Sequence, residues 1–507
     1  MAAQTANPAT SFLQRLRLDR DRLLLAAVAI AGVAIRVWVY RGPLVIPNGD
    51  EGLVGVMVRH FVHGHLAVFS WARPYGGTQE MILTVPIFWL TGTSLLGLRV
   101  VPILFSILAT FFIWRVGLRT IGRRPAAVAA GLFWVWPPFN YLVLLRAQGF
   151  YASDIAYCGL LLLLALRVVE KPDLRRVALW GFVFGLAYWQ TAQIVPIAFT
   201  TTFWMIWKAP RCLRHAWAAV ITALVGAAPW VIWNIGHGFE SLQQHPSLDT
   251  YAKSMRILIS PILAMSVGLR APYSAKLLIP SGIVTWLIYV AMLAIFLWGA
   301  WRFRHVQASL FYAIAIVFPF LYAIPRKTSY ITGFPQYTTV LTPVLALLFA
   351  QVATRYWRAV AVFAVAIVIA LVSIPRMEAW VHQPGTPPGF LSPRSFQPLA
   401  AELDQMQIKD VFADYWIAWR LNFDMRERIV AVENWSRTVT FPGGKAVPGV
   451  DPTVRWPPFD REVRAASRVA FVYWTDTYKD VAIVPELVAH GYRPTFVGPW
   501  VIFAKSS

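Results

Sequence analysis

The chain has 507 residues, of which 58% are hydrophobic and 14% are charged. Uncharged stretches of about 20 residues recur along it, and this is the length that a helix needs to cross a hydrocarbon core of roughly 30 Å. The composition therefore excludes an ordinary soluble protein and predicts a polytopic α-helical membrane protein. The net charge of +22 does not indicate nucleic-acid binding, because the basic residues gather in short loops between apolar segments.

The N-terminus carries basic residues before the first apolar run: Arg15, Arg17, Arg20 and Arg22. A secretory signal would look similar at its start. This run, however, is as long as a full span, and no convincing small-residue cleavage site follows it. We therefore expect an uncleaved signal anchor, with residues 1–21 in the cytoplasm.

Eleven segments are expected to cross the membrane, which gives a transmembrane domain over residues 22–375. They are 22–41, 95–115, 126–145, 151–169, 177–189, 191–207, 216–235, 280–300, 307–324, 338–354 and 357–375. The short basic loops between them then fall on the cytoplasmic side, as the positive-inside rule requires. An odd number of spans places the C-terminus outside.

The segment 177–207 is ambiguous. As a single helix its 31 residues would reach about 46 Å, which is too long for one ordinary span and short for two. Basic residues flank it at 175–176 and 208–214, so the chain must cross an even number of times if both clusters are cytoplasmic. We predict two spans joined by a tight outer turn at 189–193.

Three outer regions are too long to be simple connections: residues 42–94, 236–279 and 376–507. In the first, residues that follow the acidic pair Asp50-Glu51 recur at near-helical spacing: Leu53, Val56, Met57, His60, Phe61 and Val62. The spacing predicts a helix that lies along the membrane interface, with Asp50 near its amino end.

The tail begins with a proline-rich linker over 376–395 and continues as a domain over 396–507. Two amphipathic stretches, 399–406 and 481–489, are interleaved with β-rich runs at 411–415, 428–432, 469–474 and 497–504. This alternation predicts a small α/β domain on the outer side of the membrane. The tail has no obvious catalytic motif.

The expected topology leaves few acids on the outer face before the tail: Asp50, Glu51, Glu80, Asp154, Glu240 and Asp249. Basic residues that could accept a phosphate also fall on that face: Arg73, Arg99, Arg146, Arg256, Arg270, Lys276, Arg326 and Lys327. Such a set suits a reaction in which a carboxylate deprotonates a hydroxyl while cations or a metal stabilise a departing phosphate.

Several short motifs resemble the GT-C class of membrane glycosyltransferases, particularly its protein-mannosyltransferase-like and ArnT-like bacterial members. The motifs are Gly49-Asp50-Glu51-Gly52, Pro74-Tyr75-Gly76-Gly77-Thr78-Gln79-Glu80, Leu98-Arg99-Val100-Val101-Pro102, Arg146 with Gly149-Phe150-Tyr151, and the stretch 185–194. The resemblance covers residues 20–210 well and the later spans loosely. It implies a polyprenyl-phosphate sugar as donor, and transfer with inversion on the extracytoplasmic face. The lack of disulfides and the single compact set of spans favour a bacterial plasma membrane.

The resemblance also implies roles for individual residues. Asp50, with Glu51 beside it, corresponds to the catalytic base, and Glu80 to a second acid that orients substrate or metal. A divalent cation, if the enzyme uses one, would bind at Asp50 and Glu80. Where relatives carry an Arg-Tyr pair this chain has Pro335-Gln336-Tyr337, so Arg326 or Lys327 substitutes in the contact to the donor phosphate. Arg146 and Arg270 are assigned to the same phosphate. Contacts to the sugar fall to Tyr75, Trp189, Gln190, Gln193 and Tyr337.

Each assignment has a competing structural interpretation. The acids at 50–51 are also suited to the amino end of a helix, where carboxylates cap and stabilise it. Glu80 could form an ion pair with Arg73 or Arg99, and Arg146 could mark the interface, where arginine snorkels readily. The histidines at 60, 63 and 65 lack a matching ligand set and are better explained as surface residues.

Two other functions compete with glycosyl transfer: transport or flipping of a lipid-linked solute, and a non-catalytic scaffold that presents the tail. Transporters usually show internal repeats and ionisable residues in mid-span, and the sequence shows no repeat and places its acids in outer loops. The sequence leaves open the sugar, the need for a metal, and whether the acceptor is a glycan, a lipid or a protein.

Overall fold

The computed structural model describes residues 8–243, 250–272, 276–324, 335–383, 386, 392–433, 454–481 and 483–505, and only the backbone of residues 8–18. Contacts divide the chain into two compact units. The first comprises Met1–Arg41, Pro102–Leu145 and Tyr151–Trp380, and the second comprises Gly42–Val101, Arg146–Phe150 and Val381–Ser507. The second unit thus joins the first outer region to the tail, which the sequence analysis assigned to separate domains.

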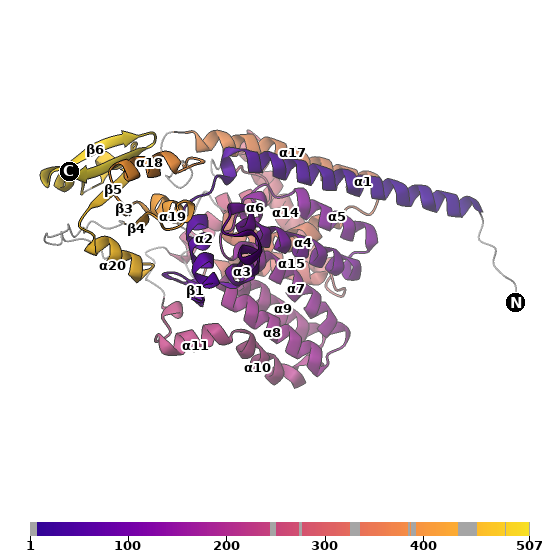
Figure 1. The fold of residues 1–507 in the computed structure, drawn as a ribbon. Coiled ribbons are helices and arrows are strands. Elements are labelled where there is room, and N and C mark those ends of the chain that lie inside the picture. The colour runs from indigo at the N-terminus through magenta and orange to yellow at the C-terminus, as the bar shows by residue number, and fades with distance from the viewer. Residues whose placement is uncertain are drawn as a thin grey trace. The chain divides into compact units, whose positions relative to one another are not determined.

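The first unit is helical in its described parts (Figure 1). Its helices are α1 (Pro8–Arg41), most of α4 (Leu95–Thr120), α5 (Arg123–Val135), α6 (Asn140–Leu145), α7 (Tyr151–Glu170), α8 (Leu174–Gln190), α9 (Val195–Lys208), α10 (Ala216–Gly226), α11 (Ala228–Gly236), α12 (Tyr251–Ile257), α13 (Ala264–Ser266), α14 (Gly282–Arg302), α15 (Ser309–Tyr322), α16 (Thr342–Ala350) and nearly all of α17 (Tyr356–Val381). Side-chain caps begin several of them. Asp173, for example, accepts a hydrogen bond from the backbone N–H of Arg176.

Within the described chain, five helices are long and apolar enough to cross a membrane, and a pair bent by 68° (Pro210–Gly226 with Ala228–Gly236) would make a sixth. The five are Asp19–Arg41, Leu95–Thr120, Tyr151–Glu170, Gly282–Arg302 and Tyr356–Val381. The other expected spans also coincide with helix, but in shorter or interrupted pieces. One is broken between α5 and α6 at 136–139, where two prolines interrupt the helical hydrogen bonds. The chain is a multi-pass membrane protein, and the total of eleven spans stays a prediction.

The predicted break inside 177–207 is confirmed. Helix α8 ends at Gln190, and Thr191 is extended, with its hydroxyl accepting a hydrogen bond from the N–H of Gln193. Helix α9 then begins at Val195 with Pro196 in its first turn, a position where proline needs no hydrogen-bond partner. The segment 177–207 therefore forms two separate helices and not one long helix.

The tail contains a five-stranded sheet in the order β4-β3-β5-β7-β6. Figure 1 labels β3, β4, β5 and β6. Its strands are β3 (Asp410–Ala413), β4 (Val430–Glu433), β5 (Val469–Trp474), β6 (Tyr492–Val497) and β7 (Trp500–Lys505). Strands β3, β4 and β5 are parallel to one another, and β7 and β6 continue the sheet in antiparallel fashion. The strand β5 is buried on both faces, so its side chains alternate between two hydrophobic cores.

Helices cover both faces of this sheet. Helix α18 (Gln397–Gln405) contributes to one core, α20 (Pro457–Ala465) and α21 (Val484–Ala489) contribute to the other, and α19 (Tyr415–Asp424) contributes to both. The runs at 411–415, 428–432 and 469–474 mark strands as predicted. The sequence analysis missed β6, an edge strand with several exposed side chains, and α19, whose first residue it counted as strand.

The first outer region contains α2 (Gly49–Val62), the short strands β1 (Phe69–Ser70) and β2 (Arg73–Gly77), and α3 (Gln79–Thr91). The helix after the acidic pair is thus present, and its position along the membrane interface stays a prediction. Nearly all of α2 is buried, and it shares a hydrophobic core with α3 and with the tail, including Trp419 and Phe423 of α19.

Three glycines let α2 approach α19 closely. A Cβ atom would lie 2.9 Å from Cα of Trp416 at Gly49, 2.5 Å from the carbonyl oxygen of Trp419 at Gly52, and 2.4 Å from the ring of Phe423 at Gly55. The spacing of three residues puts the glycines on one face of the helix. Part of the Gly-Asp-Glu-Gly motif therefore serves helix packing.

Replacement of Gly52 by alanine should destabilise the second unit by about 1–3 kcal/mol, because the contacted atoms belong to backbone that cannot move aside cheaply. Gly282→Ala is the matched control, since a Cβ atom there would meet nothing within 4 Å. Thermal unfolding of both variants in detergent checks this. Equal midpoints would contradict the close packing of α2 on α19.

Candidate active site

The site begins at the amino end of α2. Asn48 has extended backbone angles (φ −120°, ψ −176°), and its side-chain oxygen accepts a hydrogen bond from the N–H of Glu51 at 3.2 Å. Asn48 is therefore the helix cap. Asp50 and Glu51 lie in the first turn, where the helix dipole favours negative charge, and their carboxylates are available for other partners.

Glu51 is sealed inside the second unit, with no exposed surface. Its two oxygens accept hydrogen bonds from Nε and Nη2 of Arg99, both at 2.6 Å, and Oε1 also accepts the N–H of Ala147 at 3.0 Å. Arg99 in turn donates to the carbonyl of Val45 at 2.8 Å. This buried ion pair ties α2 to the start of α4 and to the segment 146–150.

Asp50 has a different environment, because successive residues of a helix point about 100° apart. Its Oδ1 accepts hydrogen bonds from the hydroxyl of Tyr415 at 2.5 Å and from Nη2 of Arg73 at 3.1 Å. Its Oδ2 has no hydrogen-bond partner among the described residues, and 24% of the side chain is exposed. One oxygen is thus fixed, and the other is open to a reactant.

Tyr415 comes from the first turn of α19, 365 residues from Asp50 in sequence. Its hydroxyl also accepts a hydrogen bond from Arg73 at 3.1 Å, and the guanidinium of Arg455 lies 4.9 Å from the ring centre. Burial raises the pKa of this hydroxyl well above its ordinary value, and the neighbouring charge of Asp50 raises it further, whereas the two arginines oppose the shift. Tyr415 therefore keeps its proton and donates it to Asp50 as a hydrogen bond.

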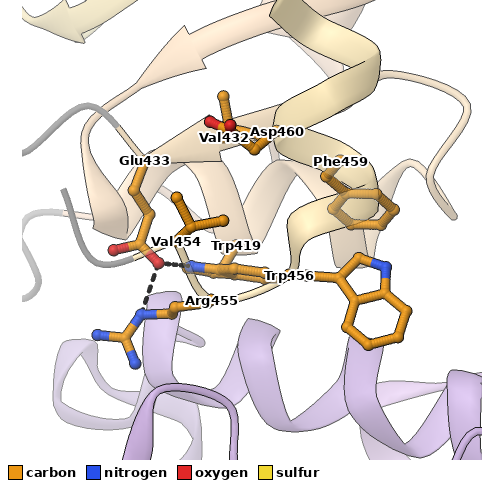
Figure 2. A pocket seen from close by; sticks show the side chains of 8 residues that line it. All are labelled: Trp419, Val432, Glu433, Val454, Arg455, Trp456, Phe459 and Asp460. Atoms are coloured by element: carbon orange, nitrogen blue, oxygen red, sulfur yellow. Dashed lines mark hydrogen bonds and ion pairs between the residues drawn. The ribbon is translucent and has the colours of Figure 1, made fainter.

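A small hollow, open to solvent, lies in the tail at Arg455 (Figure 2). It is lined by Trp419, Val432, Glu433, Val454, Arg455, Trp456, Phe459 and Asp460. Glu433 joins two walls by accepting a hydrogen bond from the indole of Trp419 at 2.6 Å and pairing with Arg455 at 2.5 Å, as Figure 2 shows. Burial raises the pKa of Glu433, with Arg455 opposing the shift.

The structure places the other predicted residues of the second unit as follows. Glu80 is buried in the first turn of α3, and Tyr75, in β2, is 52% exposed. Arg146 is buried and donates hydrogen bonds to the carbonyls of Leu44 and Ile46, so it holds the chain that leads into α2.

Five predicted residues belong to the first unit: Arg270, Trp189, Gln190, Gln193 and Tyr337. Gln190 is buried and donates to the hydroxyl of Ser153 at 3.0 Å, and the rings of Tyr337 and Tyr151 are 6.2 Å apart. Arg326 and Lys327 lie outside the described residues. The site described here is therefore built from the second unit.

The residues around Asp50 do not fit a metal site formed by protein side chains alone. Among the described residues, no three of His, Cys, Asp and Glu lie close enough to share an ion. The bonded oxygen of Asp50 is already shared by a cation and a hydroxyl. His60, one of the three neighbouring histidines, instead pairs with Glu427 at 3.1 Å.

Glu427 links the tail to α2 through Arg59 (2.6 Å) and His60. Burial raises the pKa of Glu427, but its bonds to His60 and Arg59 outweigh burial and hold the pKa below the ordinary value. The contribution of Glu427 to the stability of the folded protein is thus complete above about pH 4.3, the ordinary pKa of glutamate, and is lost as the pH falls through the lowered pKa.

In Glu427→Gln the thermal midpoint of unfolding should therefore fall less between pH 6 and pH 3 than in wild type. An unchanged pH dependence would contradict this.

Comparisons with known proteins bear on the fold. The family model of dolichyl-phosphate-mannose-protein mannosyltransferases matches residues 83–233. The structure is similar to ArnT from Cupriavidus metallidurans bound to undecaprenyl phosphate, with a TM-score of 0.57, 16% identity, and coverage of 96% of this chain and 98% of ArnT. The apo form of the same enzyme matches with a TM-score of 0.55 and 15% identity, and the match covers 98% of this chain and 98% of ArnT.

A more distant match is the Archaeoglobus fulgidus oligosaccharyltransferase in complex with Zn and sulfate, with a TM-score of 0.50 and 12% identity, covering 90% of this chain and 69% of that one. No curated protein matches in sequence. The chain therefore has the same fold as ArnT, in agreement with the resemblance seen in its sequence motifs.

Proposed function

We propose that this chain is an inverting glycosyltransferase that moves a monosaccharide from a polyprenyl-phosphate donor to an acceptor hydroxyl on the outer face of the plasma membrane. The GT-C fold supports the class of reaction, and the undecaprenyl phosphate bound to ArnT supports a polyprenyl-linked donor. The environment of Asp50 is the observation that carries the proposal.

Asp50 has the properties of a general base. A cation and a hydroxyl both donate hydrogen bonds to Oδ1, and 24% of the side chain remains exposed. A base must reach the proton that it removes, and a partly exposed oxygen at the amino end of a helix meets that condition. Glu51, whose oxygens are both bonded inside the protein, does not.

In the proposed reaction the acceptor oxygen attacks the anomeric carbon of the donor as Asp50 Oδ2 removes its proton. The new carbon–oxygen bond forms while the bond from the anomeric carbon to the phosphate oxygen breaks, and that electron pair leaves on polyprenyl phosphate. A single displacement of this kind inverts the anomeric configuration. Asp50 gains one proton, which it releases to water before the next cycle.

The leaving phosphate needs cationic partners. We assign this role to Arg270, Arg326 and Lys327, as the resemblance implies. For Arg146, which the resemblance also implies as a phosphate ligand, we propose a different role. Its guanidinium donates hydrogen bonds to the carbonyls of Leu44 and Ile46, so it positions the chain that leads into α2.

Substrate contacts complete the proposed site. The exposed ring of Tyr75 is suited to stacking on a sugar, and Trp189, Gln190, Gln193 and Tyr337 keep the sugar contacts implied by the resemblance. Glu80 keeps its role as the second acid, which orients substrate. We place the tail outside the cell, where it would shield the site or grip an acceptor glycan, lipid or protein.

The formation of a glycoside separates this function from transport and from a scaffold role. Wild-type protein in lipid vesicles that contain membrane acceptors should convert a labelled polyprenyl-phosphate sugar into a glycoside of the opposite anomeric configuration, detected by NMR of the product. A transporter would move the donor across the vesicle without forming a glycoside, and a scaffold would do neither. A product with retained configuration would contradict the single displacement.

A further inference from the structure

We infer that Tyr415 is a positioning residue for Asp50, so that the tail domain completes the active site. This inference rests on the proposed function. It assigns a role to a domain that has no catalytic motif of its own. The tail is far from Asp50 in sequence, yet it contributes to the function of Asp50.

The contacts at Asp50 carry the inference. Tyr415 makes the shorter of the two hydrogen bonds to Oδ1, 2.5 Å against 3.1 Å for Arg73. Arg73 also donates to the Tyr415 hydroxyl, so the three groups form a closed set in which each touches the other two. A carboxylate held at one oxygen by two partners keeps its second oxygen in a fixed direction, which is what a base needs during proton transfer.

Tyr415 is itself held firmly. The residue is 1% exposed, and Arg455 lies over its ring. Arg455 also pairs with Glu433 and donates to the carbonyl of Trp71 at 2.9 Å. The helix that carries it packs on α2 through the glycine face. Arg420 of the same helix also donates to the carbonyl of Pro47 at 2.8 Å, just before the cap of α2. The tyrosine and the acid are thus parts of one packed unit.

A purely structural tyrosine would need its ring and not its hydroxyl. The ring fills the core shared with Trp419 and Phe412, and phenylalanine would fill the same space. The hydroxyl, by contrast, touches Asp50 and Arg73. Tyr415→Phe therefore separates the two roles.

In full-length protein reconstituted in lipid, Tyr415→Phe should lower kcat by about 10- to 100-fold, comparable to the loss when a residue that orients a metal ligand is removed. The KM for the donor should change little. The acidic limb of the pH profile of kcat/KM should move to higher pH, because a carboxylate that has lost a donor holds its proton more tightly. The charged groups that face the pair are Arg73, Arg455 and Glu433.

Tyr478→Phe is the matched control, since it removes a tail hydroxyl with no hydrogen bond among the described residues.

Two further variants keep the test decisive. Incorporation of 3-fluorotyrosine at 415 retains ring and hydroxyl but makes the hydroxyl a stronger donor, so the acidic limb should move to lower pH even if Tyr415→Phe fails to fold. In an Asp50→Asn background, Tyr415→Phe should cause no further loss, because the two residues act as one.

Failure of the inference and failure of the proposed function give different results. If Asp50→Asn abolishes transfer but the Tyr415 variants match Tyr478→Phe in kcat and pH profile, the role of Tyr415 is refuted and the base assignment stands. If Asp50→Asn retains full activity, the proposed base is wrong and the inference falls with it.

Discussion

Replacement of Asp50 by asparagine is expected to lower the rate of glycosyl transfer by about 10²- to 10⁴-fold, the usual contribution of a general base. Asparagine preserves the size of the side chain and can still accept from Tyr415 and Arg73, so the fold should survive. Affinity for the donor should change little, because the open oxygen of Asp50 faces the acceptor in the proposed reaction. Steady-state kinetics at saturating donor, together with direct measurement of donor binding, check both parts.

Asp404→Asn serves as the control for this variant. Asp404 is an exposed acid of the tail that pairs with Arg428 at the surface, and its neutralisation should leave transfer unchanged. A loss of binding equal to the loss of rate in Asp50→Asn would show that the residue holds substrate and would remove it from the proton transfer.

The second large effect concerns stability. Arg99→Met should destabilise the second unit by about 3–5 kcal/mol, because it leaves the carboxylate of Glu51 buried without its charge partner. The double variant Glu51→Gln with Arg99→Met should recover much of this loss. Glutamine is neutral and still offers an oxygen to the N–H of Ala147. Thermal or denaturant unfolding in detergent gives the comparison.

A surface pair provides the control. Arg428→Met breaks an ion pair whose side chains are 51% and 42% exposed, and it should cost no more than about 1 kcal/mol. If Arg99→Met were no more harmful than Arg428→Met, or if the double variant were as unstable as the sum of its parts, the buried pair would not hold α2 in place.

Much of the local structure could be predicted from sequence. The hydrophobic spacing after Asp50 predicts α2, and the charges that flank 177–207 predict a break that the structure places at Thr191. The run 469–474 is an unbroken strand because it is apolar and rich in β-branched and aromatic residues. These features depend on neighbours in the chain.

Partners distant in the chain could not be predicted in this way. An apolar helix face shows that something covers it, but the same pattern suits a membrane interface or a protein core, so the burial of α2 against α19 was missed. The difference between Asp50 and Glu51 depends on Tyr415 and Arg99, which lie 365 and 48 residues away. Sequence analysis placed Arg99 on the outer face, and it gave no signal for Tyr415.

The central claim is that Asp50 is the base of a glycosyl transfer from a polyprenyl-phosphate sugar. The most direct test measures transfer of labelled sugar from a panel of polyprenyl-phosphate monosaccharides to membrane acceptors, by wild type and Asp50→Asn side by side in lipid. We expect wild type to use one member of the panel and the variant to bind that donor but transfer it orders of magnitude more slowly. Equal transfer by both proteins, or no transfer from any donor, would contradict the claim.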